Sequence, residues 1–139
     1  MRASRVVVGA VVGCLALASA PVASAADDLM SGSYTVKGPN EIIDTWTISN
    51  LCNVIETGCL ANVTSPLITG QAVYQGAHTW MMRVVGQVPV CPDRSKTKGA
   101  MVFTWNTQTL SGQVTEIQQG NCVMTRPGQS VVPITLVAA

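Results

Sequence analysis

Apolar and polar residues alternate with a period of two along much of the chain after residue 32. Successive side chains of a β-strand point to opposite faces of the sheet, so this pattern predicts strands with one buried face. After the first 25 residues, no stretch has apolar residues at helical spacing over three turns. The predicted strands are 33–37, 45–49, 59–63, 71–75, 79–85, 87–91, 101–105, 113–118, 122–125 and 131–137.

Residues that favour turns lie between these segments, chiefly glycine, proline and asparagine. Short connections favour antiparallel pairing of successive strands. We therefore expect a single small all-β domain of about eight strands, an antiparallel meander barrel, with a β-sandwich as the alternative. Pro133 falls inside the last segment. Because proline cannot donate a ladder hydrogen bond, we expect this strand to lie at a sheet edge or to begin after the proline.

The first 25 residues have the pattern of a secretory signal peptide. Arg2 and Arg5 precede an apolar run over residues 6–18, which is shorter than the roughly 20 apolar residues that span a bilayer. The Ala-Ser-Ala sequence at residues 23–25 is a cleavage site of the A-x-A kind. We therefore expect cleavage after residue 25 and a single exported domain over residues 26–139.

Cys14 offers an alternative route of processing. The residues before it resemble the lipobox of bacterial lipoproteins, in which the cysteine is acylated and becomes the new N-terminus. We favour cleavage at the later site, because the apolar run continues past Cys14. The expected location is extracellular or associated with the cell wall.

The charge of the chain argues against two classes of partner. The full chain of 139 residues carries a formal net charge of +1. Loss of Arg2 and Arg5 leaves six Lys and Arg against seven Asp and Glu, so the exported domain has a net charge of about −1. Nucleic acids and anionic membranes call for clustered basic residues. The nearest approach to such a cluster, residues 94–98, is interpreted as a solvated loop, and we expect neither partner.

Four cysteines remain after the predicted cleavage, namely Cys52, Cys59, Cys91 and Cys122. An even number of cysteines in an exported chain indicates disulfide bonds, and three pairings are possible. We favour Cys52 with Cys59 and Cys91 with Cys122, because the six residues between the first two can form a tight turn between strands. A zinc site is not expected, since no C-x-x-C occurs and His78 is the only histidine.

The sequence offers little for catalysis. A Ser-His-Asp hydrolase needs a base held by a carboxylate, whereas His78 lies in a predicted hairpin turn and is interpreted as a surface residue. No glycine loop precedes a helix to hold phosphate. Paired carboxylates for glycoside hydrolysis belong to no recognisable motif. The acidic residues considered are interpreted as ordinary surface: Glu41, Asp44, Glu56, Asp93 and Glu116. We therefore expect a non-enzymatic protein without a cofactor.

Aromatic residues are the candidates for a ligand site. Trp46, Trp80, Phe103 and Trp105 could line a cavity for a small apolar ligand if their side chains face the inside of a barrel. The alternative interpretation is that all four form plain hydrophobic core.

Several segments form a pattern of strand, cysteine hairpin and Cys-Pro-Asp. They are GSYTV at 32–36, TWTIS at 45–49, GCLANV at 58–63, VPVCPD at 88–93, FTW at 103–105 and LSG at 110–112. This pattern resembles small secreted proteins of mycobacteria and their relatives. More distantly, it is similar to the extracellular lipocalin-like β domains of some mycobacterial receptor kinases. The resemblance implies secretion and a β fold, and it carries no catalytic residue to this chain.

Three functional hypotheses follow. The first is a secreted, non-enzymatic domain that binds a partner in the cell envelope or the extracellular space, based on export, disulfides and missing catalytic groups. The second is a lipocalin-like carrier of a small apolar ligand, based on the predicted meander and the tryptophans. The third is a protease inhibitor that presents residues 90–94, a loop tethered by a disulfide at Cys91.

Overall fold

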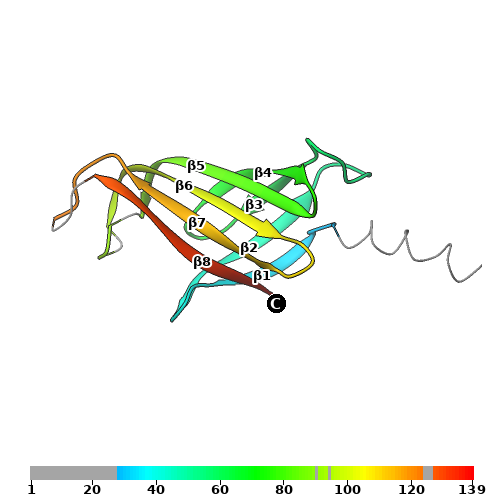
Figure 1. The fold of residues 1–139 in the computed structure, drawn as a ribbon, viewed down its shortest axis with the longest axis horizontal. Helices are drawn as coiled ribbons and strands as arrows, with labels where there is room; N and C mark the ends of the chain where they lie inside the picture. Colours follow the sequence, from blue (N-terminus) through cyan, green and yellow to red (C-terminus); the bar gives the residue numbers. More distant parts are fainter. Residues whose placement is uncertain (1–27, 90, 94, 124–126) are drawn as a thin grey trace, which may run out of the picture.

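The chain folds into a closed antiparallel barrel of eight strands (Figure 1). A computed structural model describes residues 28–89, 91–93, 95–123 and 127–139. Each strand pairs with the next one along the chain, and β8 pairs with β1 to close the sheet. The strands are β1 (Gly32–Lys37), β2 (Ile42–Asn50), β3 (Leu60–Thr64), β4 (Thr69–Gly76), β5 (Thr79–Pro89), β6 (Lys96–Asn106), β7 (Ser111–Gln118) and β8 (Gly128–Ala138).

This architecture confirms the predicted all-β meander barrel over the β-sandwich. The described part of the chain contains no helix. The predicted strand at 122–125 is not found where it can be assessed, because Cys122 and Val123 lie in the β7–β8 loop and residues 124–126 lie outside the described residues. The predicted signal peptide, residues 1–25, also lies outside them.

Period-two alternation decides which side chains face the inside of the barrel. In β2, Asp44, Trp46 and Ile48 are buried, and the residues between them are exposed. In β8, Ile134 and Leu136 are buried in the same alternating way. Each buried face lies on the inside of the closed sheet, so the barrel interior is the hydrophobic core.

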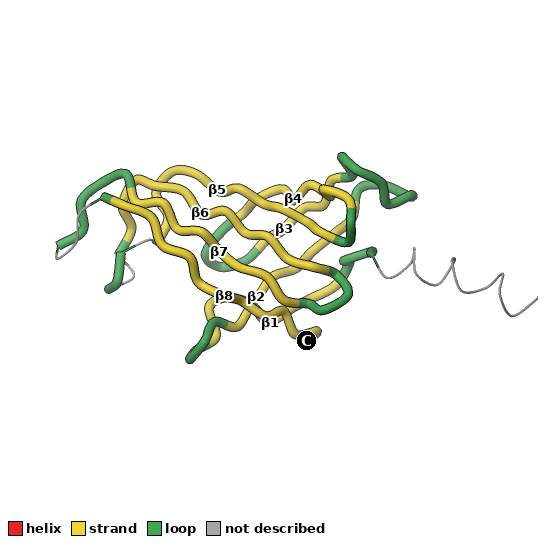
Figure 2. The backbone as a smooth tube through the Cα atoms, viewed as in Figure 1, coloured by secondary structure: helices red, strands yellow, loops and turns green. Residues whose placement is uncertain are grey.

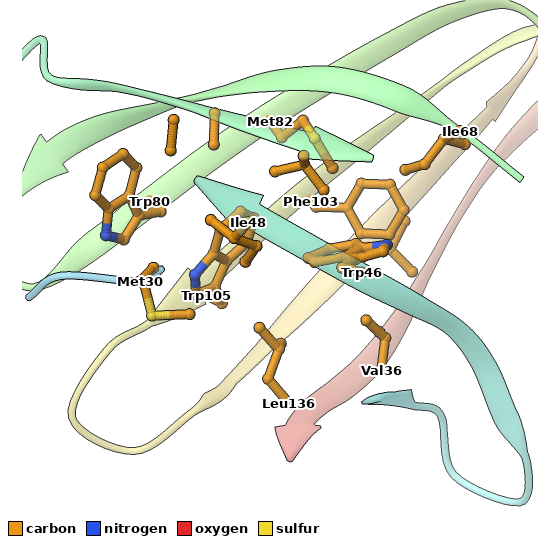
Figure 3. Packing of buried hydrophobic residues seen from close by; sticks show 14 of the residues in the cluster. Met30, Val36, Trp46, Ile48, Ile68, Trp80, Met82, Phe103, Trp105 and Leu136 are labelled. Carbon is orange, nitrogen blue, oxygen red and sulfur yellow. The ribbon is translucent and has the colours of Figure 1, made fainter. Parts of the chain in front are cut away.

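Three tryptophans and one phenylalanine form the centre of this core (Figure 3). The ring centroid of Trp46 lies 5.0 Å from that of Phe103, with the planes at 82°, and 5.3 Å from that of Trp105. Trp80 packs against Tyr74 at a centroid distance of 5.3 Å. Such aromatic pairs contribute about 0.5–1.5 kcal/mol each beyond the burial of their area. The middle of the barrel is therefore filled by side chains.

The loops fall into two sets at opposite ends of the barrel (Figure 2). One end, here called the open end, carries the β1–β2, β3–β4, β5–β6 and β7–β8 loops. The other, here called the closed end, carries the β2–β3, β4–β5 and β6–β7 loops together with residues 28–31 and the C-terminus.

One disulfide lies at each end. Cys52 and Cys59 are joined within the β2–β3 loop, with their Cα atoms 5.9 Å apart. Cys91 and Cys122 join the β5–β6 loop to the β7–β8 loop, with their Cα atoms 5.6 Å apart. Both predicted pairings are confirmed. Disulfides persist in oxidising compartments, which is consistent with an extracellular location.

Pro133 does not place its strand at a sheet edge. β8 runs through Pro133 and pairs with strands on both sides. Pro133 lies opposite Gln113 of β7, whereas the ladder between β8 and β1 includes only residues from Thr135 onward. The side of β8 that faces β1 is thus unpaired at Pro133, and the missing N–H removes no ladder bond there. The proline is tolerated by its position along the strand.

Gly86 does not break its strand either. The expected interruption between residues 85 and 87 is wrong, because β5 continues from Thr79 to Pro89. Gly86 has a φ of 115°, a backbone conformation that glycine adopts at little cost. It lies opposite Gly99 of β6, so the β5–β6 ladder stays continuous through this irregularity.

Candidate functional site

A cavity of about 280 Å³ lies at the open end of the barrel. Its lining comes from three loops at this end and from the inward faces of several strands. The lining residues are Gly38, Pro39, Asn40, Glu41, Ile43, Asp44, Leu67, Ile68, Cys91, Pro92, Met101, Phe103, Val114, Glu116 and Val132. The cavity is therefore a hollow inside the barrel mouth, bounded by both strands and loops.

The inner wall of the cavity is apolar. Met101 and Phe103 project inward from β6, and Val114 projects inward from β7. Phe103 also packs edge-on against Trp46, which belongs to the filled core. The cavity thus ends where the aromatic core begins, and Phe103 forms part of both.

Asp44 is the buried polar group of the cavity wall. It lies on the inward face of β2, two residues before Trp46, and only 9 % of its surface is exposed. Its Oδ1 accepts a hydrogen bond from the backbone N–H of Thr45 at 2.8 Å, and its Oδ2 accepts one from the indole Nε1–H of Trp46 at 3.1 Å. Both carboxylate oxygens therefore act as acceptors, and both donors are neutral.

Among the described residues that line the cavity, every charged side chain is acidic. Glu41 from the β1–β2 loop and Glu116 from β7 join Asp44 in the lining. The hydroxyl of Ser130 donates a hydrogen bond to Glu116 at 3.4 Å. No Lys, Arg or His occurs among the described residues that line the cavity. The described wall is thus apolar and negatively charged.

A second polar cluster, here called the Asp28 cluster, lies at the closed end. The Asp28 carboxylate accepts hydrogen bonds from Tyr74 Oη at 3.1 Å, His78 Nδ1 at 2.7 Å and Thr107 Oγ1 at 2.7 Å. The indole Nε1–H of Trp80 donates to the backbone carbonyl of Asp28 at 3.2 Å. These bonds connect the segment before β1 to β4, to the β4–β5 and β6–β7 loops, and to the core residue Trp80.

Hydrogen bonding decides the ionisation of Asp28. Burial by itself would raise the pKa of its carboxyl group, but the hydrogen bonds from His78, Thr107 and Tyr74 and the charge of His78 outweigh burial and lower the pKa. Burial raises the pKa of the neighbouring Tyr74 hydroxyl, and its hydrogen bond to Asp28 adds to that effect. The cluster therefore contains an ionised carboxylate held by hydrogen bonds from three side chains.

The β4–β5 turn places His78 in this cluster. Ala77 and His78 have φ values of 51° and 62°, a left-handed conformation that costs a non-glycine residue about 1–2 kcal/mol. The backbone N–H of His78 donates to Tyr74 Oη at 2.8 Å, which helps to hold the turn. Because Nδ1 faces a carboxylate, Nδ1 carries a proton and donates this hydrogen bond. His78 is therefore part of a structural hydrogen-bond network at the closed end.

The structure separates the four aromatic candidates for ligand binding. Phe103 lines the cavity, whereas Trp46, Trp80 and Trp105 lie in the filled core and outside the cavity lining. The tryptophans shape the site only indirectly, through the contact of Trp46 with Phe103 and its hydrogen bond to Asp44.

Sequence reasoning missed the two buried carboxylates. The interpretation of Asp44 as ordinary surface is wrong, because Asp44 is buried on the inward face of β2. Extending the alternation back from Ile48 through Trp46 would have placed it there. Asp28 carries no comparable signal, since it precedes the first strand and its partners are 46 to 79 residues away in the chain.

Comparison with protein-family models, with curated proteins and with solved structures found no match to this chain. In the described residues, no group of three or more His, Cys, Asp or Glu side chains is arranged to hold a metal ion. No helix within the same residues has the length and apolar character needed to cross a membrane.

Proposed function

We propose that this chain is an exported binding protein that holds one small ligand with an apolar body in the cavity at the open end. The observation that carries this proposal is a largely apolar hollow of about 280 Å³ at the mouth of a closed eight-stranded barrel. Barrels of this size are either filled by side chains or hold one small ligand. This barrel combines a filled middle with a hollow end.

The volume of the cavity limits the size of the ligand. An engineered apolar cavity of about 150 Å³ holds benzene, and this cavity is roughly twice as large. A ligand of about 10 to 12 non-hydrogen atoms, such as one aromatic ring with a short chain, would occupy it. Ligand pockets usually begin at about 300 Å³, so the site lies at the small end of their range.

One loop of the cavity lining is tethered by a disulfide. Cys91 and Pro92 line the cavity, and the disulfide from Cys91 to Cys122 joins their loop to the β7–β8 loop at the same end. A loop that is tethered before binding loses less conformational entropy when a ligand enters. This supports a preformed binding site.

We propose binding without catalysis. The single histidine of the chain lies in the Asp28 cluster at the closed end, and the cavity lies at the open end. An imidazole base is thus remote from the described residues that would contact the ligand. The expectation of a protein partner in the cell envelope stays a prediction, as does the protease-inhibitor hypothesis, for which residues 90 and 94 lie outside the described residues.

The test uses a pair of substitutions on one strand. Val132 lines the cavity, and its neighbour Val131 is exposed on the outer face of β8. Val132→Phe should fill the cavity, and Val131→Phe should leave it unchanged. Protein recovered from culture fluid is examined by native mass spectrometry, and after removal of bound material it is titrated calorimetrically with short phenylalkyl compounds.

We expect the wild-type protein and Val131→Phe to bind at least one of these compounds, and Val132→Phe to lose at least tenfold in affinity. Circular dichroism confirms that both variants are folded. Absence of binding by the folded wild-type protein to every compound, together with no co-purifying ligand, would refute the proposed function.

A further inference from the structure

We infer that the ligand carries a positive charge, as an organic ammonium group attached to its apolar body, and that Asp44 binds this group. The inference rests on the proposed function, since it names the chemical class of the ligand in the same cavity. The observation behind it is a buried carboxylate in the cavity wall with no cation against it in the described residues.

A buried carboxylate is costly when no positive charge accompanies it. From the described part of the chain, Asp44 receives two hydrogen bonds, and both come from neutral N–H groups of Thr45 and Trp46. These bonds satisfy one acceptor position on each oxygen, while a carboxylate offers about four such positions. Acceptor capacity and negative charge therefore remain at a site that lines the cavity.

The structural role of Asp44 does not require its charge. The buried indole N–H of Trp46 needs an acceptor, and an asparagine carbonyl would supply one in the same place. A neutral side chain would do so without the desolvation cost of an ion. The fold therefore does not require the negative charge of Asp44, and a cation in the cavity would pair with it.

The rest of the described lining favours an organic cation over a metal ion or an anion. Glu41 and Glu116 share the sign of Asp44, so none of the charged residues described in the lining would repel a cation at Asp44. The carboxylates that the structure describes do not form a metal-binding group. Apolar side chains such as Phe103 and Val114 make up the inner wall. An ammonium head with a short apolar body matches both features.

Three probes with one body and different head groups test this inference. They are 3-phenylpropylammonium, 3-phenylpropan-1-ol and 3-phenylpropionate, titrated calorimetrically into the wild-type protein. A hydrogen bond to a charged group contributes about 1.5–3 kcal/mol, so the ammonium should bind at least about tenfold more tightly than the alcohol. The carboxylate should bind more weakly than the alcohol, because its charge repels Asp44.

A substitution with a matched control assigns the effect to Asp44. Asp44→Asn should weaken binding of the ammonium probe about tenfold and change binding of the alcohol less than threefold. Glu56→Gln removes one negative charge from an exposed position in the β2–β3 loop at the closed end, and it should change neither affinity.

The outcomes separate this inference from the proposed function. Equal affinity of the wild-type protein for the ammonium and the alcohol would overturn the inference and leave the cavity as a binding site for neutral ligands. The same holds if Asp44→Asn is folded and binds the ammonium unchanged. No binding of any of the three probes would count against the proposed function itself. Because the first comparison uses the wild-type protein, the inference remains testable even if Asp44→Asn fails to fold.

Discussion

Removal of the Asp28 side chain should destabilise the barrel at its closed end. The carboxylate accepts side-chain hydrogen bonds from Tyr74, His78 and Thr107, and each such bond to a charged group contributes about 1.5–3 kcal/mol. The three contributions do not add, because the donors share one carboxylate. Water can also replace part of the bond to His78, whose side chain is 37 % exposed. We therefore expect Asp28→Ala to lower the free energy of unfolding by about 2–4 kcal/mol at pH 7.

An asparagine at this position separates charge from hydrogen bonding. Asp28→Asn keeps one carbonyl acceptor in place of Oδ1, which receives the bonds from His78 and Thr107. Because it keeps this acceptor and loses only the negative charge, we expect the free energy of unfolding to fall by a smaller amount, about 1–2 kcal/mol. Guanidinium unfolding with the disulfides intact, followed by tryptophan fluorescence, measures the free energy of unfolding of both variants. Glu56 is an exposed carboxylate at the same end, so Glu56→Gln serves as the control and should change the free energy of unfolding by less than about 0.5 kcal/mol.

The effect of Asp28 should also depend on pH. Its folded-state pKa is lowered by the hydrogen bonds, so its stabilising contribution is fully present above the unfolded-state pKa of about 3.9. The contribution is lost as the pH falls through the lower pKa of the folded state. The stability difference between the wild-type protein and Asp28→Ala should thus shrink as the pH falls below about 4. A difference below about 0.5 kcal/mol at pH 7, or one that does not shrink on acidification below that pH, would refute this account.

Two backbone positions give predictions of opposite sign, both measured by thermal unfolding. Ala77 is an exposed residue in the left-handed conformation, so Ala77→Gly should raise the free energy of unfolding by about 0.5–1 kcal/mol; a decrease would contradict the assigned turn. A Cβ atom at Gly112 would overlap the carbonyl oxygen of Thr104, so Gly112→Ala should force β6 and β7 apart and cost at least about 2 kcal/mol. An unchanged melting temperature for Gly112→Ala would contradict the close β6–β7 contact.

The strands could be predicted because each one has a buried face and an exposed face. Trp46 and Ile48 in β2, and Phe103 and Trp105 in β6, alternate with outward-facing residues as a half-buried sheet requires. The short loop between Cys52 and Cys59 likewise favoured one of the three possible pairings, and the structure has that pairing. The starts of two strands were predicted too late, because β6 begins at Lys96 and β8 at Gly128, in residues that lack the alternating pattern.

The two buried carboxylates differ in how far the same rules could have placed them. Period-two alternation, extended back from Ile48 through Trp46, places Asp44 on the inward face of β2, and the prediction missed it because a charged residue was interpreted as surface. The Trp46 indole that donates to this carboxylate is only two residues away, so the residues that indicate the position of Asp44 are its neighbours in the sequence. The Asp28 cluster is different in kind. Its members come together only when β4, the β4–β5 turn and Thr107 meet at one end of the closed sheet.

The position of the cavity follows from where the large side chains lie along the barrel axis. The interior of an eight-stranded barrel is just wide enough for inward-facing side chains to fill. Trp80 and Trp105 face inward near the closed end, and Trp46 with Phe103 fills the middle (Figure 3). Toward the open end the inward residues become smaller, with Val114 on β7 and Val132 on β8.

These two valines cannot reach as far across the interior as an indole, and a hollow remains that they line together with Asp44. A tryptophan in place of either valine would fill the hollow, and Asp44 would then be inaccessible to a ligand. Small side chains and a buried negative charge thus occur together at one end of an otherwise filled barrel. Packing alone explains the filled end, and the proposed ligand would occupy the hollow end.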